Sequence, residues 1–375
     1  MSMRACIWAA ILAVVGFGLS SQAAFAQDGV TPMPVNTRTT TVRAIVQESS
    51  SLFVQYGIAG KPTNLAIENS ARVWVTLPEL NAIGVISVTA TTSPTVTAYQ
   101  VRTYYLTPGS QPYDLAFAGG ALWFTAFGGN AIGRIDPTTD AMQMYPIPVQ
   151  DSGPTGIAVA TDGTIWFAQQ KANNLGQFNP ISGTFATYPY SFQNAGLEEV
   201  ATVTANSIWM TAPAVNRIVN FEPSTNGFAS IPTLPYTQPV GLALEPGDVP
   251  WVSTMGSNLI GRYSPGTLAL WRWTALPSAD ATALGPQRIA LTKGSAPWNL
   301  FYANAPAQII GQIYIGADTA PGRIRQLPGP GSACTPLDVA VDNQNNAWFT
   351  CGNANTVVNW RSPYTMDRYL PLMVK

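Results

Sequence analysis

Two recurring positions in the chain carry side chains that could bind a ligand or do chemistry. One is the pair of residues between a recurring Pro, or its equivalent, and a short apolar run; the other lies three residues after a recurring Trp. The candidate ligand-binding residues at these positions are Asn64, Tyr113, Asp114, Gln169, Glu198, Glu199, Arg288, Asn304 and Asp338. These residues differ between copies of a repeat whose other residues recur, so we look for function among them.

Carboxylates in this set suggest metal chemistry. If Asp114, Glu199 and Asp338 converge on one concave surface, their oxygens could hold a divalent cation such as Mg²⁺ or Ca²⁺. A calcium-dependent lactonase would use such a set, with Asn64 as a further oxygen ligand. The alternative interpretation is structural: Arg288 and Asp338 form an ion pair, and the other acids are solvated.

Composition excludes several other kinds of site. The chain contains no His and only three Cys, so the usual zinc sites and a Ser-His-Asp triad are excluded. The side chain that most often serves as a base at neutral pH is also missing. A net charge of −1 gives no basic surface for nucleic acid. We therefore expect no nucleic-acid partner.

The elements that must position the candidate residues belong to a repeat of about 40 to 50 residues, whose clearest copy is ALWFTAFGGNAIGRIDP at Ala121 to Pro137. Each copy has an apolar strand, a turn, a second strand with an aromatic residue, and an Asn or Gln seven positions after that residue. The aromatic positions are Trp74, Trp123, Trp166, Trp209, Trp251, Phe301 and Trp348. The matching amide positions are Asn81, Asn130, Asn173, Asn216, Asn258, Gln308 and Asn355.

Strand-sized apolar runs punctuated by turn residues at this period predict an all-β fold, a seven-bladed β-propeller with four antiparallel strands per blade. The expected blades are residues 58–103, 104–149, 150–192, 193–234, 235–277, 278–330 and 331–375. Each aromatic residue should fill the wedge between blades rather than stack on a ligand. Each Asn should bond its own loop between the second and third strands.

Ring closure requires the two ends of the chain to meet. Two β-like runs, Thr40 to Gln47 and Leu52 to Gly57, precede the first full copy. One of them should pair with strands of the last copy, which is expected to end at Tyr369 to Val374, because a closed ring leaves no open sheet edge.

Residues 1–26 have the features of a secretory signal peptide. Arg4 supplies the positive charge, Ile7 to Leu19 the apolar segment, and Ala24 to Ala26 the small-residue cleavage site. An uncleaved membrane anchor is the weaker alternative, because the apolar run is shorter than about 18 residues. We expect residues 27–37 to form a flexible leader and 38–375 one propeller domain. The mature form should be a periplasmic or extracellular monomer without a membrane span.

Two cysteines remain after removal of the signal peptide, Cys334 before the first strand of the last blade and Cys351 at the end of its second strand. Antiparallel neighbours joined by a short turn would bring them close, and export provides an oxidising compartment. We expect a disulfide that staples the blade closing the ring.

The repeat resembles that of the virginiamycin B lyase (streptogramin lyase) family of seven-bladed propellers. The resemblance is carried by Pro154-Thr155-Gly156-Ile157-Ala158, Trp123-Phe124-Thr125 and Asn130-Ala131-Ile132-Gly133-Arg134-Ile135-Asp136-Pro137. It implies the ring and, in the family's lyases, opening of a cyclic depsipeptide by elimination, with a His base and Mg²⁺ held near Glu residues. That His falls on Leu337, beside Pro336, and the Glu falls at or next to Cys351.

Two hypotheses about function follow from these observations. The first is an exported binding or scaffolding module that presents its central funnel to a small molecule, a glycan or a protein. The second is a divergent metal-dependent enzyme, either a lyase acting on a cyclic depsipeptide or a lactonase, that uses the acidic funnel residues. Because Leu337 cannot take a proton, the sequence favours the first hypothesis.

Overall fold

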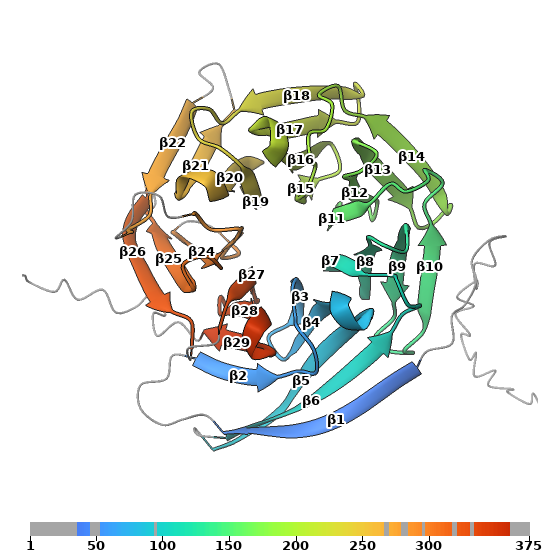
Figure 1. Cartoon of the computed structure of the whole chain (residues 1–375), viewed down its shortest axis with the longest axis vertical. Coiled ribbons are helices and arrows are strands. Elements are labelled where there is room, and N and C mark those ends of the chain that lie inside the picture. Colours follow the sequence, from blue (N-terminus) through green and yellow to red (C-terminus); the bar gives the residue numbers. More distant parts are fainter. Residues whose placement is uncertain are drawn as a thin grey trace, which may run out of the picture.

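The protein is represented by a computed structural model that describes residues 36–45, 53–93, 96–265, 270–278, 284–294, 297–316, 321–330 and 334–360. Seven antiparallel sheets surround a central axis (Figure 1). The helices among the described residues are single 3₁₀ turns at Pro78–Leu80, Pro213–Val215, Met255–Ser257 and Gly352–Ala354. The prediction of an all-β, seven-bladed propeller is confirmed. The expected signal peptide, most of the leader and the run 369–374 lie outside the described residues.

Each blade is built outwards from a short strand at the axis. In blades 1 to 3 the strands are β3 (Leu65–Asn69), β4 (Arg72–Leu77), β5 (Ala82–Ser93) and β6 (Val96–Tyr105); β7 (Pro112–Ala118), β8 (Ala121–Ala126), β9 (Ala131–Ile135) and β10 (Met142–Pro146); and β11 (Pro154–Val159), β12 (Ile165–Gln169), β13 (Asn174–Asn179) and β14 (Thr184–Pro189). In blades 4 to 6 they are β15 (Val200–Thr204), β16 (Ser207–Ala212), β17 (Arg217–Glu222) and β18 (Gly227–Pro232); β19 (Pro239–Glu245), β20 (Val249–Thr254), β21 (Leu259–Ser264) and β22 (Leu270–Ala275); and β23 (Arg288–Leu291), β24 (Trp298–Asn304), β25 (Ile309–Ile315) and β26 (Pro321–Pro328). Blade 7 contains β27 (Pro336–Val341), β28 (Ala347–Cys351), β29 (Thr356–Trp360) and β2 (Phe53–Gly57).

The repeated aromatic residue fills the wedge between neighbouring blades, as predicted. The core divides into seven hydrophobic clusters, each of which spans one interface between blades. Trp74 of blade 1 is fully buried and packs with Leu115 and Leu122 of blade 2. Trp348 of blade 7 packs with Leu65 and Val73 of blade 1, which completes the circle. Strands such as β8 are buried at every position because sheets cover both of their faces.

The repeated Asn is a turn residue, as predicted, but the prediction that its side chain bonds its own loop is wrong for Asn130, which bonds a later segment instead. Asn130 has a φ of 49°, in the left-handed region that Asn tolerates better than most residues. Its amide nitrogen donates to the carbonyl oxygens of Ile147 (3.2 Å) and Val149 (2.9 Å), and its Oδ1 accepts the Ser152 N–H at 2.8 Å. These bonds hold the segment that leads to the next blade, so the turn in one blade fixes the position of its neighbour.

The ring is closed by a strand from the beginning of the chain. β2 pairs antiparallel with β29 and forms the outermost strand of blade 7, which confirms the prediction for the run Leu52 to Gly57. The other run lies in β1 (Asn36–Ile45), which pairs with β6 as a fifth strand of blade 1. This fifth strand was not predicted, and it begins inside the expected leader.

Cys334 and Cys351 form a disulfide, as predicted, with their Cα atoms 4.8 Å apart. Both residues are buried, with exposed fractions of 1% and 0%. The bond joins the entrance of β27 to the end of β28, in the same blade that β2 closes. It therefore reinforces the one sheet assembled from both ends of the chain.

Replacing both cysteines with Ala should lower the free energy of unfolding by about 3 kcal/mol, because the bridge closes a loop of 17 residues and loops of this size restrict the unfolded chain by about that much. Guanidinium unfolding of the wild type, with and without reductant, and of the Cys334→Ala/Cys351→Ala variant measures the effect. Reductant should shift only the wild type. Thiol titration would confirm that the reduced sample is reduced. If its unfolding midpoint then equals that of the oxidised wild type, the prediction is wrong.

Candidate ligand-binding site

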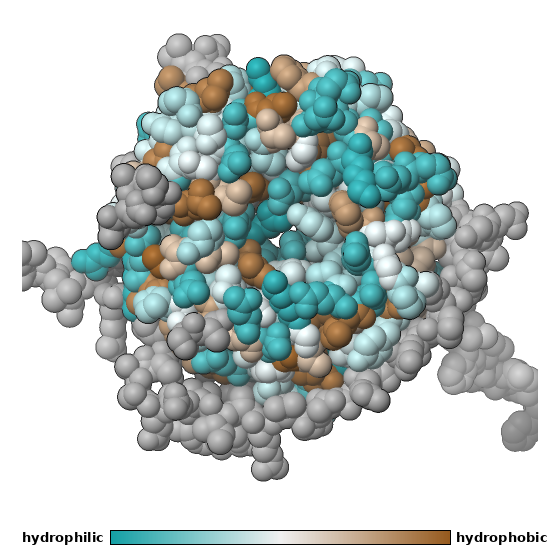
Figure 2. Space-filling model, in the orientation of Figure 1, coloured by the Kyte–Doolittle hydropathy of each residue, from teal (hydrophilic) through white to brown (hydrophobic). Residues whose placement is uncertain are grey.

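A cavity of about 550 Å³ opens at the centre of one face of the ring. Figure 2 shows this face hollowed at the axis, with hydrophilic side chains around the opening. The lining residues are Thr63, Asn64, Pro78, Glu79, Gln111, Pro112, Tyr113, Phe127, Glu198, Val240, Met255, Gln287, Arg288 and Leu337. Tyr113 and Phe127 form an aromatic wall, and Val240, Met255 and Leu337 line the cavity with aliphatic surface.

A β-bulge at the start of the innermost strand aims side chains at the axis. In β7 the register with β8 shifts between Pro112 and Leu115, so Tyr113 and Asp114 stand outside the regular ladder. The Thr125 hydroxyl, two residues after the blade's Trp, accepts the Asp114 N–H at 3.1 Å. Equivalent register shifts occur in β11, β19 and β27. In these four blades the Pro-x-x pattern therefore marks the bulge, whereas the blades that carry Glu198 and Arg288 show no register shift at this position.

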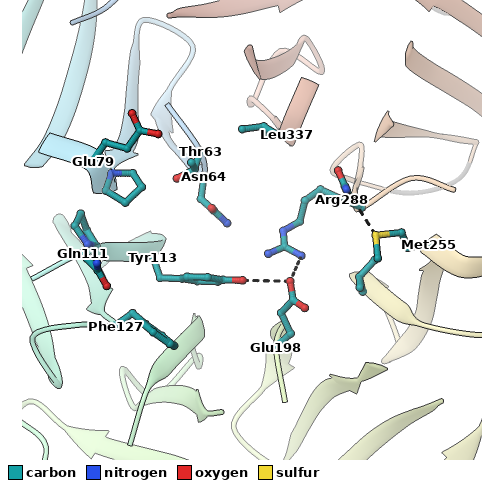
Figure 3. A pocket seen from close by; sticks show the side chains of 14 residues that line it. Thr63, Asn64, Glu79, Gln111, Tyr113, Phe127, Glu198, Met255, Arg288 and Leu337 are labelled. Carbon is teal, nitrogen blue, oxygen red and sulfur yellow. Dashed lines mark hydrogen bonds and ion pairs between the residues drawn. The ribbon is translucent and has the colours of Figure 1, made fainter. Parts of the chain in front are cut away.

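Arg288 lies at the centre of the candidate site. Its guanidinium extends from blade 6 to blade 4, where Nη1 lies 3.3 Å from Glu198 Oε1 and 3.3 Å from Glu199 Oε2. The Tyr113 hydroxyl of blade 2 donates to Glu198 Oε1 at 3.2 Å (Figure 3). Three blades thus contribute to one cluster, whereas the sequence had suggested a pair between Arg288 and Asp338.

Asp114 and Asp338 connect neighbouring blades. Asp114 accepts the N–H of Leu115 at 2.8 Å through Oδ1 and that of Ile157, in blade 3, at 3.0 Å through Oδ2. Asp338 does the same across the interface between blades 7 and 1, accepting from Val339 at 2.8 Å and from Leu65 at 2.8 Å. Both carboxylates have each oxygen engaged by backbone, so both serve as clamps between blades.

The predicted metal set does not fit a metal ion. Among the described residues, no group of three or more His, Cys, Asp or Glu side chains is placed to hold one. The oxygens of Asp114 and Asp338 accept backbone hydrogen bonds, and Glu199 is paired with the Arg288 guanidinium. The three carboxylates therefore share no set of free oxygens for a metal ion, and no step of the proposed function uses one.

The remaining predicted residues divide into two groups. Asn64 lines the cavity, and its amide nitrogen lies 3.5 Å from Asp114 Oδ1. Gln169 and Asn304 are buried and are not among the residues lining the cavity. Asn304 instead donates to the Leu284 carbonyl at 3.1 Å and accepts from the Ala307 N–H at 3.1 Å. Asn304, three residues after Phe301, therefore serves the turn that follows.

Several lining residues were not predicted, because they lie one or two positions beyond the third residue after the Trp. Pro78, Phe127 and Met255 each stand four residues after the Trp of their blade, and Glu79 follows Pro78. This position varies between copies, as do the positions that were considered. That variability was the signal by which these lining residues could have been found. Whether the third or the fourth residue after the Trp faces the cavity depends on the 3₁₀ turns that follow strands such as β4 and β20.

Burial changes the protonation of the central carboxyls. It raises the pKa of Asp338 to about 7, although the Arg288 guanidinium and two backbone N–H groups oppose the shift. Burial also raises the pKa of Asp114 and, further, that of Glu199, again against the effect of Arg288. The pKa of the Tyr113 hydroxyl is raised by burial and by the nearby Glu198. Asp114, Glu199 and Asp338 therefore keep protons at a pH where exposed carboxyls have lost them.

Seven wedge-packed blades around an acidic axial cavity define a propeller with a site of the size that holds small molecules. The chain belongs to the virginiamycin B lyase family, whose model matches residues 52–272. No curated protein matches the sequence.

Similar solved structures include a catalytically inactive histidine-to-alanine variant of virginiamycin B lyase from Staphylococcus aureus with quinupristin, at 21% identity over 82% of this chain and 98% of that one, with a TM-score of 0.69. A streptogramin B lyase is 21% identical over 82% of this chain and 96% of its own, with a TM-score of 0.67. Hydrazine synthase of Kuenenia stuttgartiensis reaches a TM-score of 0.62 at 11% identity, covering 81% of this chain and 96% of its own. Identity at these levels shows the fold alone.

The position that the resemblance assigns to the family's catalytic His is part of the cavity. Leu337 lines it and is drawn among the site residues in Figure 3. The resemblance places the family's Glu at or next to Cys351, which is buried and forms the disulfide. Of the two positions that the resemblance assigns, one is therefore an apolar residue in the cavity lining and the other is a disulfide-bonded residue outside that lining.

Replacing Arg288 with Met should lower the free energy of unfolding by about 3–5 kcal/mol at pH 8, because Glu198 and Glu199 lose their counter-charge in a mostly buried site. Arg288→Lys, which keeps the charge, should lose less. The loss should shrink at pH 5, because burial raises the pKa of Glu199 well above its usual value and this carboxyl takes up a proton there. Urea unfolding gives the free energy of unfolding of the wild type and both variants. If Arg288→Met is as stable as the wild type at pH 8, the ion pairs do not contribute to stability.

The free energy of unfolding should fall as pH rises from about 4 to 8. Unfolded carboxyls lose their protons near pH 4, whereas folded Asp338 keeps its proton until about pH 7. Between these values the folded state binds more protons, so raising the pH favours unfolding. Urea unfolding at several pH values gives the slope. Asp338→Asn should be less stable but have a shallower slope, and an unchanged slope would exclude Asp338 as its source.

Proposed function

We propose that the protein is an exported binding module that takes a small-molecule ligand into its central cavity. The observation that carries this proposal is the cavity itself. Its volume of about 550 Å³ lies within the range typical of sites for small ligands. Its apolar walls and its few convergent polar groups, Tyr113, Glu198 and Arg288, are the combination such sites use.

The same site lacks the His base that the family's lyases use. The chain has no His, and Leu337 occupies the position of the family's base. The Tyr113 hydroxyl keeps its proton because its pKa is raised, and Asp338 has both oxygens bonded to backbone. The solved lyase variant with quinupristin is catalytically inactive, which supports the idea that a propeller of this shape can hold a ligand without turning it over.

Export is supported by two features. The first is the signal peptide expected at residues 1–26. The second is the disulfide, a bond that persists in oxidising compartments such as the periplasm or the extracellular space. The described residues include no helix with the length and apolarity needed to cross a bilayer.

A ligand screen tests the proposal. The mature protein would be mixed with streptogramin B, lactones, short glycans and divalent metals, and its melting temperature and binding heat would be measured. A ligand of the cavity should raise the melting temperature. Leu337→Trp should abolish the shift, because the indole would fill the cavity, whereas Leu270→Trp, on the exposed outer strand β22, should keep it.

Mass spectrometry of the recovered ligand separates binding from catalysis. An unchanged ligand is the expected result. Ring opening of a depsipeptide or lactone that is lost in Leu337→Trp would replace the binding module with the enzyme hypothesis. Failure of every compound to bind, or binding that Leu337→Trp leaves intact, would overturn the central cavity as the site.

A further inference from the structure

We infer that the ligand of the central cavity is a hydrophobic organic cation, such as an amine or quaternary ammonium compound with an aromatic or aliphatic body. The inference rests on the proposed function, because it names the class of ligand for that same cavity. It follows from the charge, the walls and the protonation of the site.

The lining of the cavity has two acidic residues, Glu79 and Glu198, and one basic residue, Arg288. The Arg288 guanidinium is already paired with Glu198 and with Glu199, which is not a lining residue. At the rim, Glu79 lies 4.0 Å from Lys61 and is 67% exposed, so it is only weakly neutralised. Because a concave site with low-dielectric walls concentrates the field of its charges, the cavity should attract cations and repel anions.

The protein already stabilises one organic cation at this place. Arg288 is only 8% exposed, and its Nη1 lies 3.3 Å from Glu198 Oε1 and 3.3 Å from Glu199 Oε2. Glu198 also lines the cavity, and its side chain remains 21% exposed. Glu198 is therefore the carboxylate that can meet a second cation entering from the open face (Figure 3).

The walls suit the body of such a ligand. The rings of Tyr113 and Phe127 lie 6.1 Å apart, and the faces of aromatic rings attract cations. Phe127 already carries the Lys171 ammonium group at 5.0 Å from its centroid, so Tyr113 is the ring left for a ligand. Val240, Met255 and Leu337 provide aliphatic surface for an apolar group. A bare metal ion would use neither kind of wall.

Binding of a cation should release protons. The charged and titratable groups around the cavity floor are Tyr113, Asp114, Glu198, Glu199, Arg288 and Asp338. Burial raises the pKa of Asp114, Glu199 and Asp338, so these groups hold protons near neutral pH. A positive ligand favours their charged forms and expels those protons. Affinity should therefore rise with pH, which a neutral or anionic ligand would not show.

Calorimetry with matched probes tests the inference. Benzyltrimethylammonium keeps its charge at every pH, phenethylamine is a primary amine, benzyl alcohol is neutral and phenylacetate is anionic. We expect both cations to bind about tenfold or more tighter than benzyl alcohol, and phenylacetate not to bind. Titrations of benzyltrimethylammonium at pH 6.5 in phosphate and in Tris should differ in heat, because the protein releases protons. Its affinity should increase about threefold or more from pH 5.5 to 7.5.

Variants assign the effect to the cavity. Glu198→Gln should weaken benzyltrimethylammonium binding about tenfold, and Tyr113→Leu should weaken it while Tyr113→Phe retains most of it. Glu222→Gln, on the exposed end of β17, is the matched control and should bind like the wild type. Circular dichroism and the melting temperature check that each variant is folded.

The outcomes separate this inference from the proposed function. If benzyl alcohol or phenylacetate binds as tightly as the cations, and Leu337→Trp abolishes that binding, the cavity is a binding site but the cation inference is wrong. Calcium or magnesium that displaces benzyltrimethylammonium in a Glu198-dependent manner would replace the organic cation with a metal. If neither cation binds at millimolar concentration, the inference is overturned, while the ligand screen still decides the proposed function.

Discussion

Burial of one large aromatic side chain between each pair of neighbouring sheets is the interaction on which the whole structure depends. A single blade has two apolar faces, and only two neighbours can cover both of them. The chain meets this requirement by repeating the same wedge around a circle, with Phe301 replacing Trp in blade 6. β2 then completes the last sheet. Because the ring must close, the position of every blade is fixed by the packing of all the others.

This constraint places residues from distant parts of the sequence around one axis. The innermost strands begin together at the funnel, so Asp338 can accept the N–H of Leu65 across 273 positions of sequence. Arg288 similarly joins blade 6 to blade 4. The bulge that turns Tyr113 towards the cavity also turns Asp114 towards blade 3. One local irregularity thus supplies both a lining residue and a clamp, and changes at the site will also be felt at blade interfaces.

Features that depend on local sequence and on period could be predicted. The ring, the wedge role of residues such as Trp74, the left-handed turn at Asn130, and the pairing of Cys334 with Cys351 follow from spacing and residue type. The side-chain partners could not be predicted. Two examples are the backbone N–H from which Asp114 accepts and the pairing of Arg288 with Glu198 and Glu199. Both depend on how far each blade is rotated about the axis. Periodicity contains no information about that rotation.

The charges at the axis are not explained by stability. Removing the carboxyls from water raises their pKa values, and replacing a buried ion pair with well-packed apolar residues is often neutral or stabilising. Asp114 and Asp338 act as clamps, but Glu198 and Glu199 do not bond a neighbouring backbone N–H through any carboxylate contact described here. The Glu198 carboxylate instead leaves a partly exposed acidic group in the lining of the cavity. The cation that we infer for the cavity would give this carboxylate a second partner, which would offset part of the free energy that its burial costs.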